Sequence, residues 1–140
     1  GSEMCIRDRR LYATPKMQRL FPVTYEPYGD PNRYTVSIEV NPMRDRTNTN
    51  NTTEGFFTRN AYDSSVMLVA DILYRNNLDA NTNTILRHYD STWKDCPKFM
   101  QPDTVINNES VEYNREYLQF IERVDSLIQI RRLRDEERGR

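Results

Sequence analysis

Hydrophobic residues recur along this sequence with two different periods, and each period predicts a different kind of element. Residues 34–40 carry an apolar side chain at every second position, which is the period of a strand. Their apolar face consists of Tyr34, Val36, Ile38 and Val40, and their polar face consists of Thr35, Ser37 and Glu39. Because β-branched and aromatic residues favour strands, we expect a strand here. A shorter apolar stretch, residues 84–88, leads into His88 and predicts a second strand.

Two longer stretches have the spacing of three and four residues that predicts a helix. The first covers residues 58–76, with Thr58 as its N-cap and Asn76-Asn77 as its stop. Its apolar positions are Tyr62, Val66, Val69, Ala70 and Leu73. The second covers residues 110–134 and starts at Ser110. Its apolar stripe consists of Tyr113, Tyr117, Phe120, Ile121, Val124, Leu127 and Ile128.

The order of these elements predicts the fold class. A strand, a helix and a second strand in succession form a β-α-β unit, with neighbouring parallel strands and a right-handed crossover. We therefore expect an α/β fold. Residues 11–33 contain four prolines, which forbid a long helix and favour short strands or an ordered loop. Residues 41–56 and 97–109 are predicted to be loops.

Composition excludes several classes of protein. A length of 140 residues fits one domain with a sizeable core. The net charge of −1 gives no general attraction to nucleic acid or anionic membranes. No apolar run approaches the roughly 18 residues that a membrane span needs. Cys5 and Cys96 are too few for a disulfide framework, and we expect Cys96 to be a free thiolate or a metal ligand.

The candidate chemistry lies in residues 85–97. This stretch contains the only histidine of the sequence, His88, and a cysteine eight residues later, Cys96. Imidazole and thiolate are favoured zinc ligands. Lys94 places a cation between them, and Pro97 fixes the exit of the chain. One interpretation is a strand end and a rigid loop that carry two metal ligands, and the other is a histidine and a cysteine with purely structural roles.

Glu39 is a candidate of a different kind. It lies near the C-terminal end of the predicted strand 34–40, where a carboxylate can face a cleft. On this strand alone, a solvent-facing glutamate of a half-buried sheet is the better interpretation.

Two segments together resemble a known family, the zinc-dependent N-acetylmuramoyl-L-alanine amidases of the type 2 class. The class includes phage lysozymes, bacterial autolysins and the animal peptidoglycan-recognition proteins. The resemblance covers residues 29–130. It is carried by Arg87-His88-Tyr89-Asp90, Lys94 and Cys96-Pro97, which resemble the segment with the second and third metal ligands, and by Val36-Ser37-Ile38-Glu39-Val40, which resembles the Ile-Gly-Ile-Glu strand. The fold that it implies is a mixed central β-sheet flanked by helices.

The resemblance also implies metal-assisted amide hydrolysis. Zinc, the implied cofactor, would lower the pKa of a bound water, and the resulting hydroxide would attack the carbonyl that joins N-acetylmuramic acid to L-Ala of the stem peptide. His88 and Cys96 would be zinc ligands. Glu39 would act as general base or orient the water, and Lys94 would stabilise the oxyanion. Peptidoglycan is then the partner of a monomeric enzyme.

The sequence departs from the family at one zinc ligand. The family has a further histidine on an early strand, and this sequence has no histidine besides His88. Residues 1–10 resemble translated adapter read-through and are interpreted as non-native. Both observations predict a partial amidase domain over residues 11–130 without its first strands, followed by a polar tail over residues 131–140. We therefore expect low or no activity from this chain.

Two alternatives to an amidase stay open. One is a non-catalytic peptidoglycan-binding module of the same fold, because some family members keep the substrate groove and lose a ligand. The other is a soluble α/β domain whose histidine and cysteine are structural. A phage endolysin released from the cytoplasm and a secreted or periplasmic autolysin both fit the expected site of action, the cell wall.

Overall fold

A computed structural model describes residues 14–20, 35–40, 57–92, 96–97, 100 and 114–139. Of these residues, 67% are helical and none lies in a strand. The prediction of an α/β fold with a mixed central β-sheet is therefore wrong for this part of the chain. Its helices, in chain order, are α2 (Pro15–Leu20), α5 (Arg59–Arg75), α6 (His88–Thr92) and α7 (Arg115–Arg138).

The stretch predicted as the first strand does not form one. Residues 35–40 have no regular secondary structure, and Tyr34 lies outside the described residues. Val36, expected on the buried face, is 71% exposed. A period of two shows only that a stretch suits a sheet, because a strand also needs a neighbour that pairs with its backbone groups. No other described stretch is a strand that could be this neighbour.

The second predicted strand, residues 84–88, is replaced by a turn and the start of a helix. The N–H groups of Thr84 and Ile85 donate to the Asn81 carbonyl at 3.2 and 3.0 Å. The Thr84 hydroxyl accepts from the Asn81 N–H at 3.0 Å. These local bonds use backbone groups that a sheet would otherwise pair. Because His88 then begins α6, the described residues contain no β-α-β unit.

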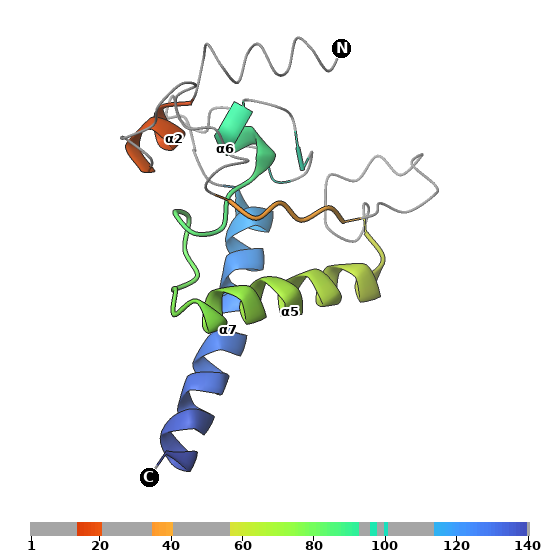
Figure 1. The fold of residues 1–140 in the computed structure, drawn as a ribbon. Coiled ribbons are helices and arrows are strands. Elements are labelled where there is room, and N and C mark those ends of the chain that lie inside the picture. The colour runs from red at the N-terminus through yellow and green to blue at the C-terminus, as the bar shows by residue number, and fades with distance from the viewer. Residues whose placement is uncertain are drawn as a thin grey trace. The chain divides into compact units, whose positions relative to one another are not determined.

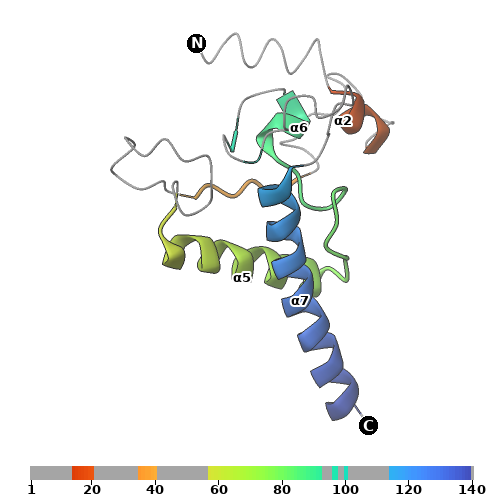
Figure 2. The same cartoon turned by 180° about the vertical axis from the view of Figure 1, so that it is seen from behind.

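The chain forms two compact units. Unit 1 comprises residues 1–38 and 86–101, and unit 2 comprises residues 39–85 and 102–140. Within unit 1, α2 contacts α6, and within unit 2, α5 packs against α7 (Figure 1, with the reverse view in Figure 2). None of the helices described is long and apolar enough to cross a membrane.

The core of unit 2 lies between α5 and α7. The buried residues are Tyr62, Ser65, Val66, Ala70 and Leu73 of α5, and Tyr117, Ile121, Val124 and Ile128 of α7. Their spacing of three and four residues places them on one face of each helix. Both helices predicted from the sequence are therefore confirmed, with most of their predicted apolar positions buried. Val69, Phe120 and Leu127 are only half-buried, and Tyr113 lies outside the described residues.

The ends of α5 are closed by local hydrogen bonds. Thr58 is the N-cap, as predicted, and its hydroxyl accepts from the N–H three residues further on at 3.1 Å. At the other end, the Leu78 N–H donates to the Leu73 carbonyl at 2.9 Å, and the Asn77 N–H donates to the Tyr74 carbonyl at 3.1 Å. These two bonds form a Schellman motif. Asn77 takes a φ of 55°, which asparagine adopts more readily than most residues.

Helix α7 begins and ends later than predicted. Asn114 is its N-cap, and its Oδ1 accepts from the Tyr117 N–H at 2.9 Å. The predicted start, Ser110, lies outside the described residues. The helix continues through Arg138, beyond the predicted end at residue 134. Arginine and glutamate, which are frequent in this last part, are good helix formers.

Contacts between α5 and α7 advance in the same direction along both helices. Tyr62, near the start of α5, packs edge-on against Phe120, with ring centroids 5.7 Å apart. Further along both helices, the Asp71 carboxylate pairs with the Arg131 guanidinium at 2.7 Å. The two helices therefore run in the same general sense but cross obliquely (Figures 1 and 2), and ionic groups at their border supplement the apolar core.

Unit 1 contains α2, a short helix that the sequence pattern did not predict. The Thr14 hydroxyl accepts from the Met17 N–H at 3.2 Å and caps the helix. Pro15 is the first helical residue, where the missing N–H of proline has no intrahelical partner to lose. Met17 and Met100 are 0% and 6% exposed and are the buried apolar side chains of this unit among the described residues.

Candidate functional site

His88 and Cys96 both belong to unit 1. His88 is the first residue of α6 and is exposed. Cys96 is half-buried and forms no disulfide. The Tyr89 N–H donates to the Cys96 carbonyl at 3.1 Å. This hydrogen bond joins the backbone next to His88 to the backbone of Cys96, so the structure brings these two predicted ligand positions together.

A buried ion pair closes the turn that contains His88. Oδ2 of Asp90 accepts from the Arg87 backbone N–H at 2.8 Å and from Nε of Arg87 at 3.0 Å, and Oδ1 accepts from Nη2 at 2.9 Å. The Asp90 N–H donates to the Arg87 carbonyl at 3.0 Å. Asp90 is the third residue of α6, so its carboxylate reaches back to the N–H before the helix, as an acidic residue does in a capping box.

Arg87 also holds the far end of the Cys96 loop. Its Nη1 donates to the Met100 carbonyl at 2.7 Å. The Met100 N–H in turn donates to the Pro97 carbonyl at 3.0 Å, and the Cys96–Pro97 peptide bond is cis. The loop is therefore tied to the start of α6 both at Cys96 and at Met100.

The charges of this cluster are deeply buried. The side chains of Arg87 and Asp90 are 1% and 3% exposed. Lys16 of α2, whose side chain is 6% exposed, places Nζ 3.4 Å from Oδ1 of Asp90. Burial raises the pKa of the Asp90 carboxyl, but hydrogen bonds from Arg87 and the charges of Lys16 and Arg87 outweigh burial and hold this pKa below its ordinary value. The Thr14 hydroxyl donates to the Asp90 carbonyl and adds a neutral contact between α2 and α6.

The structure describes only one of the other two predicted site residues. Lys94 lies outside the described residues. Glu39 is exposed, lies in the irregular stretch 35–40 and belongs to unit 2. The predicted position of Glu39 at the end of a strand is therefore wrong, and its role as a general base stays a prediction.

His88 and Cys96 are the two donor types that zinc favours, yet the described residues do not complete a zinc site. In this part of the chain, no three histidine, cysteine, aspartate or glutamate residues are grouped so that they could hold a metal ion. The sequence contains no second histidine that could serve as a third ligand. A catalytic zinc site uses three protein ligands. By donor type alone, His88 and Cys96 would account for two of these three ligands.

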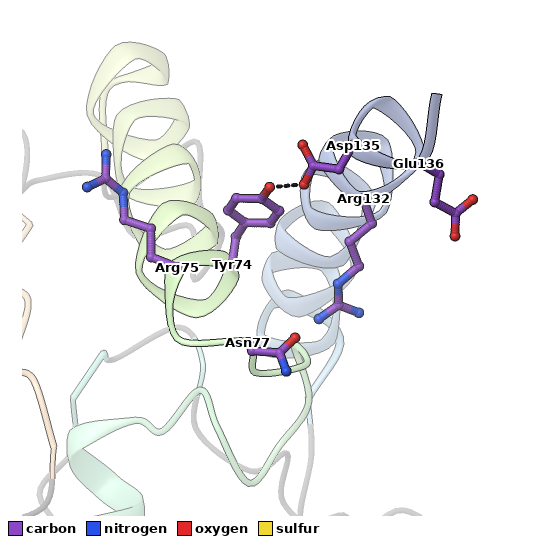
Figure 3. Close-up of a pocket in the computed structure, with 6 residues that line it drawn as sticks. All are labelled: Tyr74, Arg75, Asn77, Arg132, Asp135 and Glu136. Carbon is purple, nitrogen blue, oxygen red and sulfur yellow. Dashed lines mark hydrogen bonds between the residues drawn. The ribbon is translucent and has the colours of Figure 1, made fainter. Parts of the chain in front are cut away.

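A surface pocket of unit 2 is the other candidate site (Figure 3). It is lined by Tyr74, Arg75, Asn77, Arg132, Asp135 and Glu136. Its polar groups already serve the packing of the two helices, because Tyr74 donates to the Asp135 carboxylate and Arg132 pairs with Asp79 at 2.7 Å. The pocket contains none of the predicted site residues, and its arrangement fits a solvated border between α5 and α7.

The sequence pattern did not reveal the roles of Arg87, Asp90 and Lys16. A spacing of three residues makes an Arg–Asp contact available in a helical turn but does not show whether the pair is buried or exposed. Lys16 lies in the proline-containing N-terminal stretch, and no local pattern connects it to Asp90. Only the position of Arg87 and Asp90 on either side of His88 could have drawn attention to them.

Comparison with known proteins adds no further evidence. The sequence matches no protein-family model, no curated protein and no solved structure.

Proposed function

We propose that this chain carries part of the zinc site of an N-acetylmuramoyl-L-alanine amidase, a hydrolase that acts on peptidoglycan. The observation that carries the proposal is the 3.1 Å hydrogen bond from the Tyr89 N–H to the Cys96 carbonyl. It holds an imidazole-bearing turn and a thiol-bearing loop together, as two ligands of one metal ion require. The substrate class comes from the resemblance of residues 29–130 to the type 2 amidases.

The proposed roles follow the chemistry of each side chain. Zinc, when bound, supplies a water of lowered pKa near neutral pH. His88 and Cys96 hold the metal. By the resemblance, Glu39 would accept a proton or orient the water, and the Lys94 ammonium would stabilise negative charge on the lactyl carbonyl oxygen.

We expect this chain to be a weak catalyst. His88 and Cys96 are two donors, and the described residues offer no grouped third donor. Two donors hold zinc less tightly than the three of a catalytic site, so the fraction of chains with bound metal is low at ordinary zinc concentrations. Hydrolysis of the wall amide is therefore expected to be slow or absent.

Zinc uptake and peptide release test the proposal together. We expect the full chain to take up zinc weakly, and we expect this uptake to be lost in His88→Ala and in Cys96→Ser. Cys5→Ser is the matched control, because it removes the other cysteine of the sequence and leaves both proposed ligands. Equal zinc uptake by all four proteins would contradict the proposed site.

Release of stem peptides from purified peptidoglycan is the second readout. Little release is expected from the wild-type chain. Stoichiometric tight zinc with rapid, His88-dependent release would support the amidase and show that another residue supplies the third ligand. Rapid release that is unchanged in His88→Ala and Cys96→Ser would contradict the assigned ligands.

The incomplete donor set favours one further candidate, a peptidoglycan-binding module without catalysis. Such a module would sediment with purified peptidoglycan, release no peptide and keep its binding in His88→Ala. The absence of both binding and release would contradict the module and the amidase alike.

A further inference from the structure

We propose that Asp90 is a positioning residue of this site, because its carboxylate, held by Arg87, fixes the spacing between His88 and Cys96. The inference rests on the proposed function where it treats these two residues as ligands of one metal ion. The backbone geometry on which it is built does not depend on that function.

Two hydrogen bonds between Asp90 and Arg87 enclose His88. The carboxylate accepts from the Arg87 N–H at 2.8 Å, and the Asp90 N–H donates to the Arg87 carbonyl at 3.0 Å. His88 lies between these two residues, so one reciprocal pair of bonds closes the turn around it. Arg87 and Asp90 are buried while His88 is exposed. The pair therefore anchors the turn and leaves His88 at the surface.

The Arg87 guanidinium connects the same carboxylate to the segment that contains Cys96 and Met100. Two nitrogens of the Arg87 guanidinium, Nε and Nη2, donate to Asp90 and orient the planar group. In this orientation Nη1 donates to the Met100 carbonyl at 2.7 Å. Met100 and Cys96 are both tied by backbone bonds, the first to Pro97 and the second to Tyr89. Asp90 thus acts on the position of Cys96 through Arg87.

The buried charges of this cluster do more than stabilise the turn. Three charged side chains, those of Arg87, Asp90 and Lys16, are at most 6% exposed. Burying charges is an inefficient way to stabilise a turn, because the loss of hydration offsets much of the attraction. A two-point pair between a guanidinium and a carboxylate does, however, fix direction as well as distance. Orientation of the loop is therefore what the cluster contributes beyond packing.

Amide hydrogen exchange at Tyr89 tests this positioning role without metal, because the Tyr89 N–H is the group that joins the two ligand positions. In Asp90→Asn we expect exchange at Tyr89 to accelerate by about tenfold or more, with exchange in α5 and α7 unchanged. Asp63→Asn is the matched control, because it removes a carboxylate that pairs with Arg123 at 2.7 Å in unit 2. Tyr89 exchange should not change in this control.

Two results would overturn the inference. Unchanged exchange at Tyr89 in Asp90→Asn would show that the carboxylate does not hold the loop. Equal acceleration at Tyr89 and throughout α5 and α7 would show a purely structural role. If Asp90→Asn does not fold, the same exchange measurement is made on Arg87→Lys. Lysine keeps the positive charge but lacks the forked guanidinium that reaches Asp90 and Met100 together. Tyr89 exchange should accelerate in this variant too, and unchanged exchange would again overturn the inference.

Cobalt(II) titration links positioning to the proposed ligands. We expect the wild-type chain to give a thiolate-to-cobalt absorption band that weakens in Asp90→Asn and is unchanged in Asp63→Asn. A band of equal strength and affinity in Asp90→Asn would overturn the positioning of the ligands. A wild-type chain without any thiolate band would contradict the proposed zinc site, and the exchange experiment would still decide whether Asp90 holds the loop.

Discussion

The phenolic hydroxyl of Tyr117 in α7 donates a hydrogen bond to the backbone carbonyl of Ile85. Both residues belong to unit 2, and Ile85 ends the first of its two chain segments. Tyr117 is 1% exposed, so this carbonyl finds its partner away from water. A buried carbonyl that loses its partner keeps the cost of its lost hydration. The bond therefore ties the end of that segment to α7.

Removing this hydroxyl should destabilise the protein. We expect Tyr117→Phe to lower the free energy of unfolding by about 1–2 kcal/mol, measured by urea denaturation. Tyr74→Phe is the control, because the Tyr74 hydroxyl also has a partner, Asp135, but lies in a more exposed setting. Its effect should be smaller, and equal losses in the two variants would argue against burial as the cause.

The start of α7 gives a second prediction. Asn114→Ala should cost about 1 kcal/mol of unfolding free energy, because its Oδ1 caps the Tyr117 N–H at 2.9 Å. Asn114→Asp retains an acceptor and should stay close to wild type. Ser110→Ala tests the start predicted from the sequence. A larger loss in Ser110→Ala than in Asn114→Ala would favour that earlier start.

Arg87 and Arg123 both pair with an aspartate, but burial should make the loss of Arg87 the more destabilising of the two. Arg87→Ala leaves the buried Asp90 carboxylate without its two-point partner and should lower the free energy of unfolding by about 3 kcal/mol. Arg123→Ala breaks an ion pair whose arginine side chain is 50% exposed, and we expect a loss below about 1 kcal/mol. Chemical denaturation of both variants compares the losses, and a larger effect of Arg123→Ala would contradict the buried cluster.

Asp71 should contribute to the dependence of stability on pH. Hydrogen bonds from Arg131 and Arg75 hold the pKa of the Asp71 carboxyl below its ordinary value of about 3.8. Because the folded-state pKa is lowered, the contribution is present above about pH 4 and is lost as the pH falls through the folded-state pKa. Wild type and Asp71→Asn should therefore converge in stability under acid conditions and diverge near neutral pH. Denaturation midpoints measured across this range check the expectation, and a constant difference would contradict it.

Local sequence features predict the helical part of unit 2 well. The three-and-four spacing of apolar residues identified both α5 and α7, and Thr58 was recognised as a cap from its residue type and position. These predictions succeed because a helix makes its backbone hydrogen bonds within its own segment. The start of α7 was missed because several polar residues before it can serve as a cap, and the residue type alone does not select Asn114, which is the N-cap in the structure.

The candidate site was predictable in part. His88 and Cys96 were found from the donor types that zinc prefers, and in the structure a backbone hydrogen bond joins Cys96 to Tyr89, the residue after His88. The buried charges that tie this loop were not found, because burial of Lys16, Arg87 and Asp90 depends on contact between α2 and α6. Glu39 was assigned to a strand end that the structure does not form.

Residues 34–40 and 84–88 show most clearly where local sequence and tertiary structure differ, because their apolar patterns suit strands. Their composition establishes only that preference, because the hydrogen bonds of a strand must come from another segment. In the described residues, the first stretch has no regular structure, and in the second the Asn81 turn and α6 take its place. The sequence alone thus specifies α5, most of α7 and most of the positions that these two helices bury. Three-dimensional contacts govern strand pairing, the oblique packing of α5 on α7, and the burial of the Arg87–Asp90 pair beside His88, since each depends on residues that local periodicity cannot connect.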